Sequence, residues 1–232
     1  MEKAAIVTGG SSGIGKAVAR RLIDDGYGVV LVARGNERLE QVAREFGSRA
    51  IPLAADVSVP AACNAVLQSV LDHFGRLDVL VNSAGAAPLK PIDQTSDEAV
   101  DEAFAVNAMA PARLIARAWP IFKEQKSGCI VTMSAAVATG DPFPGFFAYA
   151  AAKASVGALT RSAALEGKRI GVKAFAIAPG AVDTPILRNN FPEKVLPASK
   201  CLKPEQVAGV ILACINGERA DDNGKTINLP AP

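Results

Sequence analysis

The sequence has a single histidine, His73, and only four cysteines, which are widely spaced and form no CxxC pair. A catalytic zinc site or a Ser-His-Asp triad needs a histidine at the site. His73 lies within Leu71-Asp72-His73-Phe74-Gly75, where we expect a helix to end and its dipole to favour a cation. The sequence therefore predicts no metal site and no triad hydrolase. We expect four reduced, structural thiols, at Cys63, Cys129, Cys201 and Cys214.

The sequence also has little excess of positive over negative charge and no long apolar run. The formal net charge is only +2, and no basic stripe with interleaved aromatic residues indicates a nucleic-acid partner. No apolar run approaches the roughly 20 residues that cross a bilayer, and Met1-Glu2-Lys3 leads into a strand-like run rather than a signal peptide. We therefore expect a cytoplasmic protein that binds a small molecule, and neither nucleic acid nor a membrane.

Hydrophobic residues make up 50% of the 232 residues, which is enough for a substantial core. No segment reads as a flexible linker, so we expect one domain over residues 1–232. Short β-branched runs alternate with Ala-rich helical stretches, and these runs are continuously apolar, as in strands buried on both faces. The pattern predicts an α/β fold with a doubly wound parallel sheet, helices on both faces, and about seven strands near 3–8, 28–33, 51–55, 78–82, 128–133, 172–178 and 225–229.

A glycine-rich turn, Thr8-Gly9-Gly10-Ser11-Ser12-Gly13-Ile14-Gly15, follows the first strand and opens a helical pattern. Glycines at 9, 13 and 15 allow a tight turn and let a pyrophosphate approach the backbone amides, whose dipoles at a helix N-terminus favour an anion. Together with the next strand, this segment has the size of one βαβ unit. It predicts a dinucleotide site, although an ordinary strand-to-helix loop can have a similar composition.

Tyr149 and Lys153 are four residues apart in an Ala-rich helical stretch, so they lie on one face of the helix. A nearby ammonium stabilises a phenolate and is expected to lower the pKa of Tyr149 toward neutrality. The pair is typical of a general acid-base tyrosine with a lysine that tunes it. The alternative is an exposed Tyr-Lys pair without a chemical role.

Polar or glycine-containing segments follow the other predicted strands, at Asp56-Val57, Asn82-Ser83-Ala84-Gly85 and Pro179-Gly180-Ala181-Val182-Asp183-Thr184. Together with the glycine-rich turn, Asn107 and the Tyr149/Lys153 pair, they resemble the short-chain dehydrogenase/reductase (SDR) family of the Tyr-xxx-Lys type. The motifs occur in the family's order over almost the whole chain. The resemblance implies a Rossmann-type fold, nicotinamide-dependent oxidoreduction of a carbonyl/alcohol pair, and a homodimer or homotetramer.

The resemblance also implies roles for individual residues. Tyr149 would exchange the proton, Lys153 would tune it and anchor the cofactor ribose, and Asn107 would bend a helix and hold a relay water. The implied cofactor-binding residues are Gly9, Ser11, Ser12, Gly13, Ile14, Gly15, Asp56, Val57, Asn82, Ala84, Gly85, Tyr149, Lys153, Pro179, Gly180, Val182 and Thr184. Asp56 and Asn107 could instead be a helix cap and a surface amide.

The second strand ends in Ala33-Arg34. A ribose with a free 2′-hydroxyl normally meets an acidic residue there, whereas a 2′-phosphate is bound by an arginine. We therefore favour NADP(H) over NAD(H), which stays possible. Arg34 could instead stack on the adenine.

The sequence departs from the family's pattern where a serine normally contacts the substrate carbonyl. Aligned on the strand, that position is Ala135, and counted back from Tyr149 it is Ala136, whereas Ser134 comes one or two residues early. Either a small insertion lets Ser134 act as a catalytic residue, or the carbonyl lacks this donor. A short lid is expected near 184–203. Apolar residues would line a substrate pocket or pack a subunit interface, namely Phe143, Phe146, Phe147, Ile186, Leu187 and Phe191.

The leading hypothesis is therefore an NADPH-preferring reductase that converts a carbonyl to an alcohol, with the proton coming from Tyr149. Because the family's serine is displaced, a cofactor-binding regulatory or scaffold protein with little catalysis is the alternative. A sugar-nucleotide epimerase or dehydratase shares the Tyr/Lys pair but belongs to longer chains with a separate substrate domain.

Overall fold

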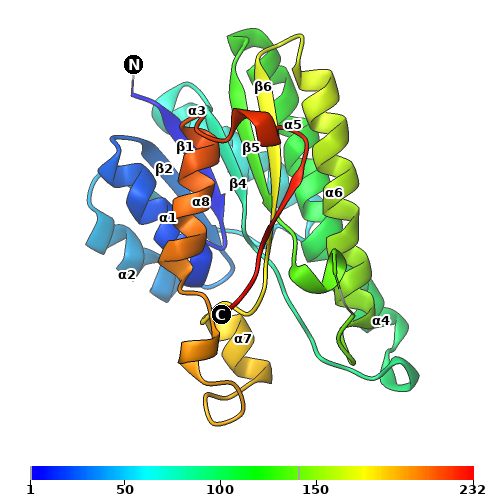
Figure 1. Cartoon of the computed structure of the whole chain (residues 1–232). Helices are drawn as coiled ribbons and strands as arrows, with labels where there is room; N and C mark the ends of the chain where they lie inside the picture. Colours follow the sequence, from blue (N-terminus) through cyan, green and yellow to red (C-terminus); the bar gives the residue numbers. More distant parts are fainter. Residues whose placement is uncertain (1, 141) are drawn as a thin grey trace.

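Seven parallel strands form one sheet in the computed structural model, which describes residues 2–140 and 142–232 (Figure 1). The strand order is β3-β2-β1-β4-β5-β6-β7. This confirms the predicted doubly wound α/β fold. The strands are β1 (Ala4–Thr8), β2 (Gly28–Ala33), β3 (Ala50–Ala54), β4 (Val79–Asn82), β5 (Gly128–Met133), β6 (Val172–Pro179) and β7 (Thr226–Leu229).

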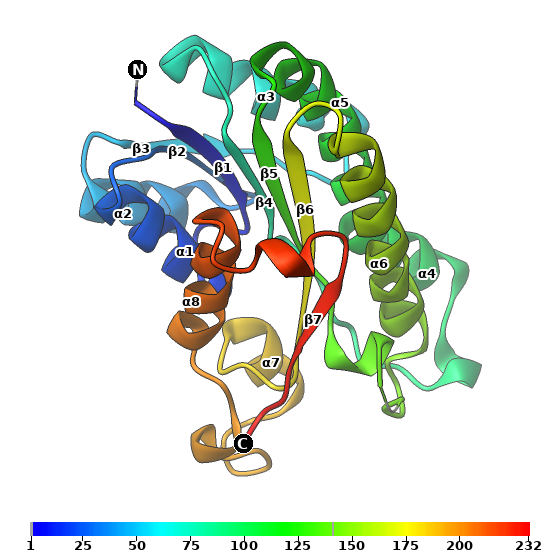
Figure 2. The ribbon, with the colours of Figure 1, turned by 45° about the horizontal axis from the view of Figure 1, so that its top comes forward.

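Helices cover both faces of the sheet. They are α1 (Gly13–Asp24), α2 (Asn36–Phe46), α3 (Pro60–Phe74), α4 (Asp97–Phe104), α5 (Ala110–Gln125), α6 (Phe147–Gly167), α7 (Pro185–Asn190) and α8 (Pro204–Ile215). Helices α1, α2 and α8 lie on one face, while α3, α5 and α6 lie on the other (Figure 2). Short 3₁₀ turns occupy residues 92–94, 136–138, 198–200 and 220–222.

The strands are apolar along their whole length because they have a helical layer on each side. In β1, Ala5 and Val7 pack with α1, α2 and α8, while Ala4 and Ile6 pack with the opposite helices. Successive side chains of a strand point to opposite faces, so one strand contributes to both halves of the core. The sheet therefore lies between two hydrophobic cores, one on each face.

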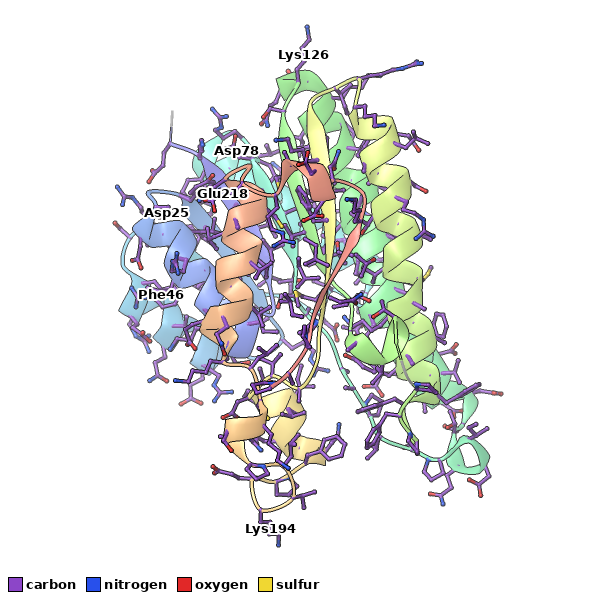
Figure 3. All side chains as sticks on the ribbon, viewed as in Figure 1. Asp25, Phe46, Asp78, Lys126, Lys194 and Glu218 are labelled. Atoms are coloured by element: carbon purple, nitrogen blue, oxygen red, sulfur yellow. The ribbon has the colours of Figure 1, made fainter. Side chains whose placement is uncertain are left out.

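The chain reverses direction across the sheet between β1 and β4. It builds β1, β2 and β3 outward, then returns to place β4 beside β1, with Thr8 opposite Asn82. Ligands of open α/β sheets bind at the carboxyl ends of the strands at such a reversal. Figure 3 shows the two ends of the molecule. Lys126, directly after α5, lies at one end, and Lys194, in the segment after α7, lies at the other.

The single histidine and the four cysteines lie away from the carboxyl ends of the strands or are buried in the core. His73 lies in the last turn of α3, with its Nδ1 atom 2.8 Å from the Ser69 carbonyl oxygen. The four cysteines are free and buried. Within residues 2–140 and 142–232, no group of His, Cys, Asp or Glu side chains has the arrangement of a metal site. No helix in this part of the chain is long and apolar enough to cross a membrane.

Candidate active site

The glycine-rich turn runs between β1 and α1, where two of its glycines have positive φ angles. Gly9 has φ +70° and Gly13 has φ +52°, and a Cβ on either would lie 3.0 Å from Ala84 N or Thr184 Cγ2, respectively. A Cβ on Gly15 would collide with the carbonyl oxygen of Gly9. The turn therefore requires glycine for its conformation and for its close approach to the segments after β4 and β6.

The first helix begins at this turn without a side-chain cap, because Ser12 makes no capping hydrogen bond. Free amide groups and the helix dipole at this position favour an anion. The side chain of Thr8 holds the neighbouring loop, since its Oγ1 accepts hydrogen bonds from Ser83 N and Ala84 N at 3.0 Å each. The backbone thus forms a cradle that fits the pyrophosphate of a dinucleotide.

Arg34 and Asp56 follow neighbouring strands, β2 and β3. The Asp56 carboxylate accepts hydrogen bonds from Ser58 N at 3.0 Å and Ser58 Oγ at 2.7 Å. These bonds, and to a smaller extent the charge of Arg34, lower the pKa of Asp56. The Arg34 side chain is exposed and has no ion-pair partner among the described residues, so it is free to bind an anion.

Helix α6 carries Tyr149 and Lys153 on the face that meets β5. Lys153 is buried, and its Nζ donates a hydrogen bond to the Met133 carbonyl oxygen at 2.7 Å. Burial lowers the pKa of Lys153 to about 8 and raises the pKa of Tyr149 to about 12. The sequence predicts the opposite direction for the tyrosine. That prediction is wrong for this structure, because desolvation of the buried phenol raises its pKa.

Asn107 lies in a π-helical turn, Ala105–Met109, between α4 and α5. Its Nδ2 donates to the carbonyl oxygens of Ala86 at 2.8 Å and Ala103 at 2.9 Å, and its Oδ1 accepts from Ala86 N at 3.3 Å. The π turn breaks the regular α-helical ladder, and the side chain satisfies the backbone groups that this exposes. Asn107 is fully buried and bonded, so it is not a surface amide.

Ser134 is also buried, and its hydroxyl donates to the carbonyl oxygen of Lys153 at 3.0 Å. The bond joins the end of β5 to α6 and uses the only proton of that hydroxyl. Asn82 likewise joins strands, because its Nδ2 donates to Thr132 Oγ1 at 3.1 Å. The geometry of both side chains favours structural roles at the sheet edge.

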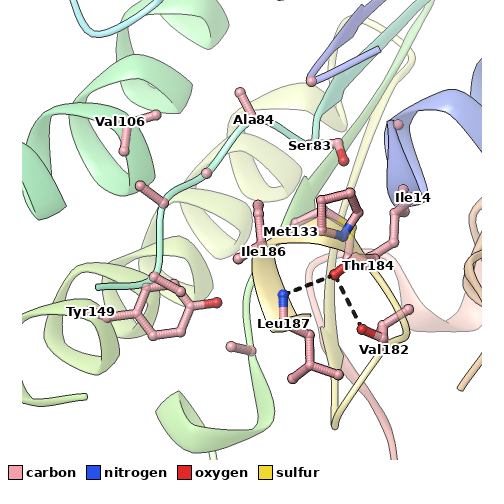
Figure 4. A pocket seen from close by; sticks show the side chains of 18 of the residues that line it. Ile14, Ser83, Ala84, Val106, Met133, Tyr149, Val182, Thr184, Ile186 and Leu187 are labelled. Atoms are coloured by element: carbon pink, nitrogen blue, oxygen red, sulfur yellow. Dashed lines mark hydrogen bonds between the residues drawn. The ribbon is translucent and has the colours of Figure 1, made fainter. Parts of the chain in front are cut away.

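A single cavity of about 890 Å³ brings these elements together. Figure 4 shows the Tyr149 hydroxyl pointing into it, facing Ile186 and Leu187. Every predicted site residue lines the cavity except Asn82 and Asn107, which lie behind its wall. The predicted residues that line it are Gly9, Ser11, Ser12, Gly13, Ile14, Gly15, Arg34, Asp56, Val57, Ala84, Gly85, Ser134, Tyr149, Lys153, Pro179, Gly180, Val182 and Thr184.

The expected lid contains α7. Thr184 caps this helix by accepting from Leu187 N at 3.3 Å, and its hydroxyl donates to the Val182 carbonyl oxygen at 3.1 Å (Figure 4). At the other end of α7, Asn190 Nδ2 donates to the Ala87 carbonyl oxygen across the cavity at 2.6 Å. The lid is therefore fastened to the wall that follows β4.

Comparisons with known proteins agree with this geometry. Residues 3–195 match the model of the short chain dehydrogenase family. The chain belongs to the short-chain dehydrogenase family. An uncharacterized oxidoreductase of Staphylococcus epidermidis is 36% identical over 212 residues, which are 91% of this chain and 90% of the relative.

Two solved structures have the same fold as this short-chain dehydrogenase. One is the 3-ketoacyl-(acyl-carrier-protein) reductase of Brucella melitensis with NADH, with a TM-score of 0.91, 29% identity, and coverage of 97% of this chain and 96% of that chain. The other is a variant of actinorhodin polyketide ketoreductase with NADPH, with a TM-score of 0.91, 26% identity, and coverage of 99% and 96%. Family membership makes the protein an NAD(P)-dependent oxidoreductase and confirms the predicted enzyme class.

The sequence did not indicate every residue that lines the cavity of this short-chain dehydrogenase. Ala86 and Ala87 directly follow the Asn82–Gly85 segment, and Val106 directly precedes Asn107, so extending these motifs could have found them. Glu102 carries no local signal, and Asn190, Val195 and Leu196 lie within the expected lid without a pattern that singles them out. Of the predicted apolar residues, Phe147 alone lies outside the cavity, with its side chain exposed.

Proposed function

We propose that this short-chain dehydrogenase reduces a carbonyl group of a small molecule to an alcohol, with Tyr149 as the proton donor. NADPH bound along the glycine-rich turn would supply the hydride. The observation that carries the proposal is that one cavity contains both this turn and the inward-pointing Tyr149 hydroxyl. With its pKa raised to about 12, the phenol is protonated at neutral pH, as a proton donor must be.

Lys153 supports this step electrostatically. Its pKa of about 8 leaves the ammonium largely protonated at neutral pH, so a positive charge stands one helical turn from Tyr149. That charge would stabilise the phenolate that remains after proton transfer. Asn107 would act as a positioning residue, because its side chain holds Ala86 in the cavity wall.

Arg34 supports a preference for NADPH over NADH. Its exposed guanidinium follows β2 at the edge of the cavity, and a planar, permanently charged fork suits a phosphate dianion. The two solved neighbours have different cofactors, NADH in one and NADPH in the other. The proposed preference therefore depends on Arg34 alone.

The test is NADPH oxidation across a panel of aliphatic, aromatic, quinone, steroid and acyl-thioester carbonyls. Tyr149→Phe is expected to lower turnover by about 10²–10⁴-fold while NADPH still binds. The chain offers a matched control in Tyr27→Phe, which removes the other tyrosine hydroxyl, in the core beside Lys3. Full activity in Tyr149→Phe would refute the proposed mechanism.

A second candidate function is cofactor binding without catalysis. The observation that favours it is the Ser134 hydroxyl, which donates to the Lys153 backbone rather than into the cavity. NADPH binding without turnover of any carbonyl in the panel would support this candidate over the reductase.

We also propose that the enzyme assembles as a homodimer or homotetramer through α5 and α6. An exposed apolar stripe supports this, formed on α6 by Phe147, Ala151, Ala154, Ala158 and Leu165. These residues recur at helical spacing, and the alanines would let another helix approach closely. A cytoplasmic location is supported by the four free cysteines, since thiols stay reduced in that compartment.

A further inference from the structure

The substrate end of the cavity is apolar and aromatic. Phe146 lies between the proton donor and the lid, with its ring centroid 5.3 Å from that of Tyr149 and 6.3 Å from that of Phe191. Phe143 meets Phe191 edge to face at 5.6 Å. Ile186, Leu187, Val195 and Leu196 extend this lining from the lid. The space around the Tyr149 hydroxyl thus fits an apolar body that can stack on aromatic rings.

Charged side chains are few along the cavity wall. Of the described residues that line it, only Arg34, Asp56, Glu102 and Lys153 are charged. Arg34 and Asp56 follow β2 and β3, and Lys153 is buried behind Tyr149 with its ammonium bonded to Met133. No basic side chain of the lid lines the cavity, so the lid offers no partner to a carboxylate or phosphate on the substrate. A neutral substrate fits this wall.

The wall at the end of β5 also lacks a free hydroxyl. Ser134 donates its proton to the Lys153 carbonyl oxygen, and the next two cavity-lining residues are Ala135 and Ala136. Thr184, across the cavity, donates to the Val182 carbonyl oxygen. Tyr149 is therefore the side chain placed to donate to a developing alkoxide in this part of the site. Loss of a second preorganised donor typically costs about 10²–10³ in rate.

We propose that the enzyme acts on neutral vicinal diketones with an aromatic or alicyclic body. This inference rests on the proposed reductase function and names its substrate class. A second carbonyl beside the reacting one withdraws electron density and stabilises the alkoxide within the substrate, which compensates for the missing donor. The reacting C=O π bond breaks as its carbon takes the hydride of NADPH and its oxygen takes the Tyr149 proton. The products are a 2-hydroxy ketone, NADP⁺ and the Tyr149 phenolate, which takes a proton back from solvent before the next turnover.

The experiment compares 1-phenylpropane-1,2-dione with propiophenone, which has the same aromatic body and only one carbonyl. The wild-type enzyme is expected to reduce the diketone and to turn over propiophenone at least 10²-fold more slowly in kcat/KM. Ala135→Ser and, in parallel, Ala136→Ser each restore a hydroxyl with one added atom. At least one of the two variants is expected to raise kcat/KM for propiophenone about 10-fold or more. The same variant should change kcat/KM for the diketone less than threefold.

Two controls separate this donor effect from general changes in the site. Ala138→Ser adds the same hydroxyl at the end of the 3₁₀ turn that follows Ala135, at a residue that does not line the cavity, and it should change kcat/KM for neither ketone. Ser134→Ala should change kcat/KM for both ketones by the same factor, because the Ser134 hydroxyl donates its hydrogen bond to the protein backbone. A loss confined to propiophenone in Ser134→Ala would identify Ser134 as the carbonyl donor and overturn the inference.

Failure of the inference and failure of the proposed function are distinguishable. Equal rates on the two ketones, or no gain on propiophenone from either serine variant, would overturn the substrate class while Tyr149-dependent turnover stands. Reduction of other carbonyls but not of the diketone would have the same meaning. No Tyr149-dependent turnover of any carbonyl would overturn both.

Discussion

Two neighbouring side chains on α6 lose water together, with opposite effects on their proton affinities. Burial disfavours the charged form of each, so the pKa of Lys153 falls to about 8 and the pKa of Tyr149 rises to about 12. Near pH 7 the pair is therefore an ammonium beside a neutral phenol.

The lowered pKa of Lys153 predicts a pH-dependent stability. An unfolded lysine stays protonated to about pH 10.4, whereas the folded one releases its proton near pH 8. Between these values the unfolded state binds more protons, so the contribution of Lys153 to the unfolding free energy rises with pH. Relative to Lys153→Met, the wild type should gain up to about 3 kcal/mol between pH 7 and pH 10.5.

Urea unfolding of both proteins at the two pH values measures this difference. The comparison is needed because burial also raises the pKa of Cys129 to about 12 and of Cys214 to about 11. These thiols stay protonated in the folded state while unfolded ones ionise, so stability falls with rising pH in both proteins. A stability difference that is constant with pH would mean that Lys153 titrates normally.

The position of Arg34 leads us to expect a preference for NADPH over NADH. Arg34→Ala should weaken NADPH binding by about tenfold or more and NADH binding much less, because only NADPH has the 2′-phosphate. Arg38→Ala, in the first turn of α2, is the matched control for loss of a surface charge. Binding of both nucleotides is measured by titration of protein fluorescence or by calorimetry. Equal weakening of the two cofactors would show that Arg34 stacks on the adenine instead.

At the scale of elements, the seven strands could be predicted within a few residues because their continuous apolar runs are local signals. The glycine-rich turn and the segments after β4 and β6 could be predicted for the same reason. The direction of the Tyr149 pKa shift was not predictable, because it depends on burial by residues distant in sequence. The Asn190 to Ala87 bond joins residues 103 positions apart, and no local pattern indicates such a contact.

The hydrogen bond between Asn190 and Ala87 leads us to expect that it holds α7 closed over the cavity. Asn190→Ala removes one hydrogen bond between α7 and the opposite wall, which is worth about 1 kcal/mol. The population in which α7 stays against that wall should therefore fall about fivefold. We expect KM for the substrate to rise by that factor, with a smaller change in kcat, and residues 185–200 to be cleaved faster in limited proteolysis. Asn189→Ala is the control, since Asn189 is exposed and precedes Asn190 in the same helix. Identical proteolysis of the two variants would contradict a fastening role for Asn190.

At the scale of the whole molecule, α6 is shared between the site and the exposed surface. One face carries Tyr149 and buried Lys153, while the stripe from Phe147 to Leu165 lies uncovered, with the side chain of Leu165 67% exposed. Met109, which directly precedes α5, and Ala116 on α5 are exposed as well. A second copy packed on these helices would remove this apolar surface from water and hold the catalytic helix against the sheet.

Ala154 lies at the middle of the stripe, so Ala154→Arg places a charge and a long side chain where a partner helix would approach. Burying an unpaired charge costs several kcal/mol, enough to shift an oligomer toward single chains at micromolar concentration. Sedimentation velocity should show a dimer or tetramer for the wild type and mainly single chains for Ala154→Arg. Activity should fall with dissociation, because α6 then loses its outer support.

Gln41→Arg adds the same charge to an exposed position of α2, in the other helical layer, and should leave both mass and activity unchanged. A wild-type enzyme that sediments as a single chain at all concentrations would refute the assembly. An Ala154→Arg oligomer of unchanged mass would place the interface on another surface. In either case the proposed chemistry of Tyr149 would stand, because the cavity and its hydroxyl are complete within one chain.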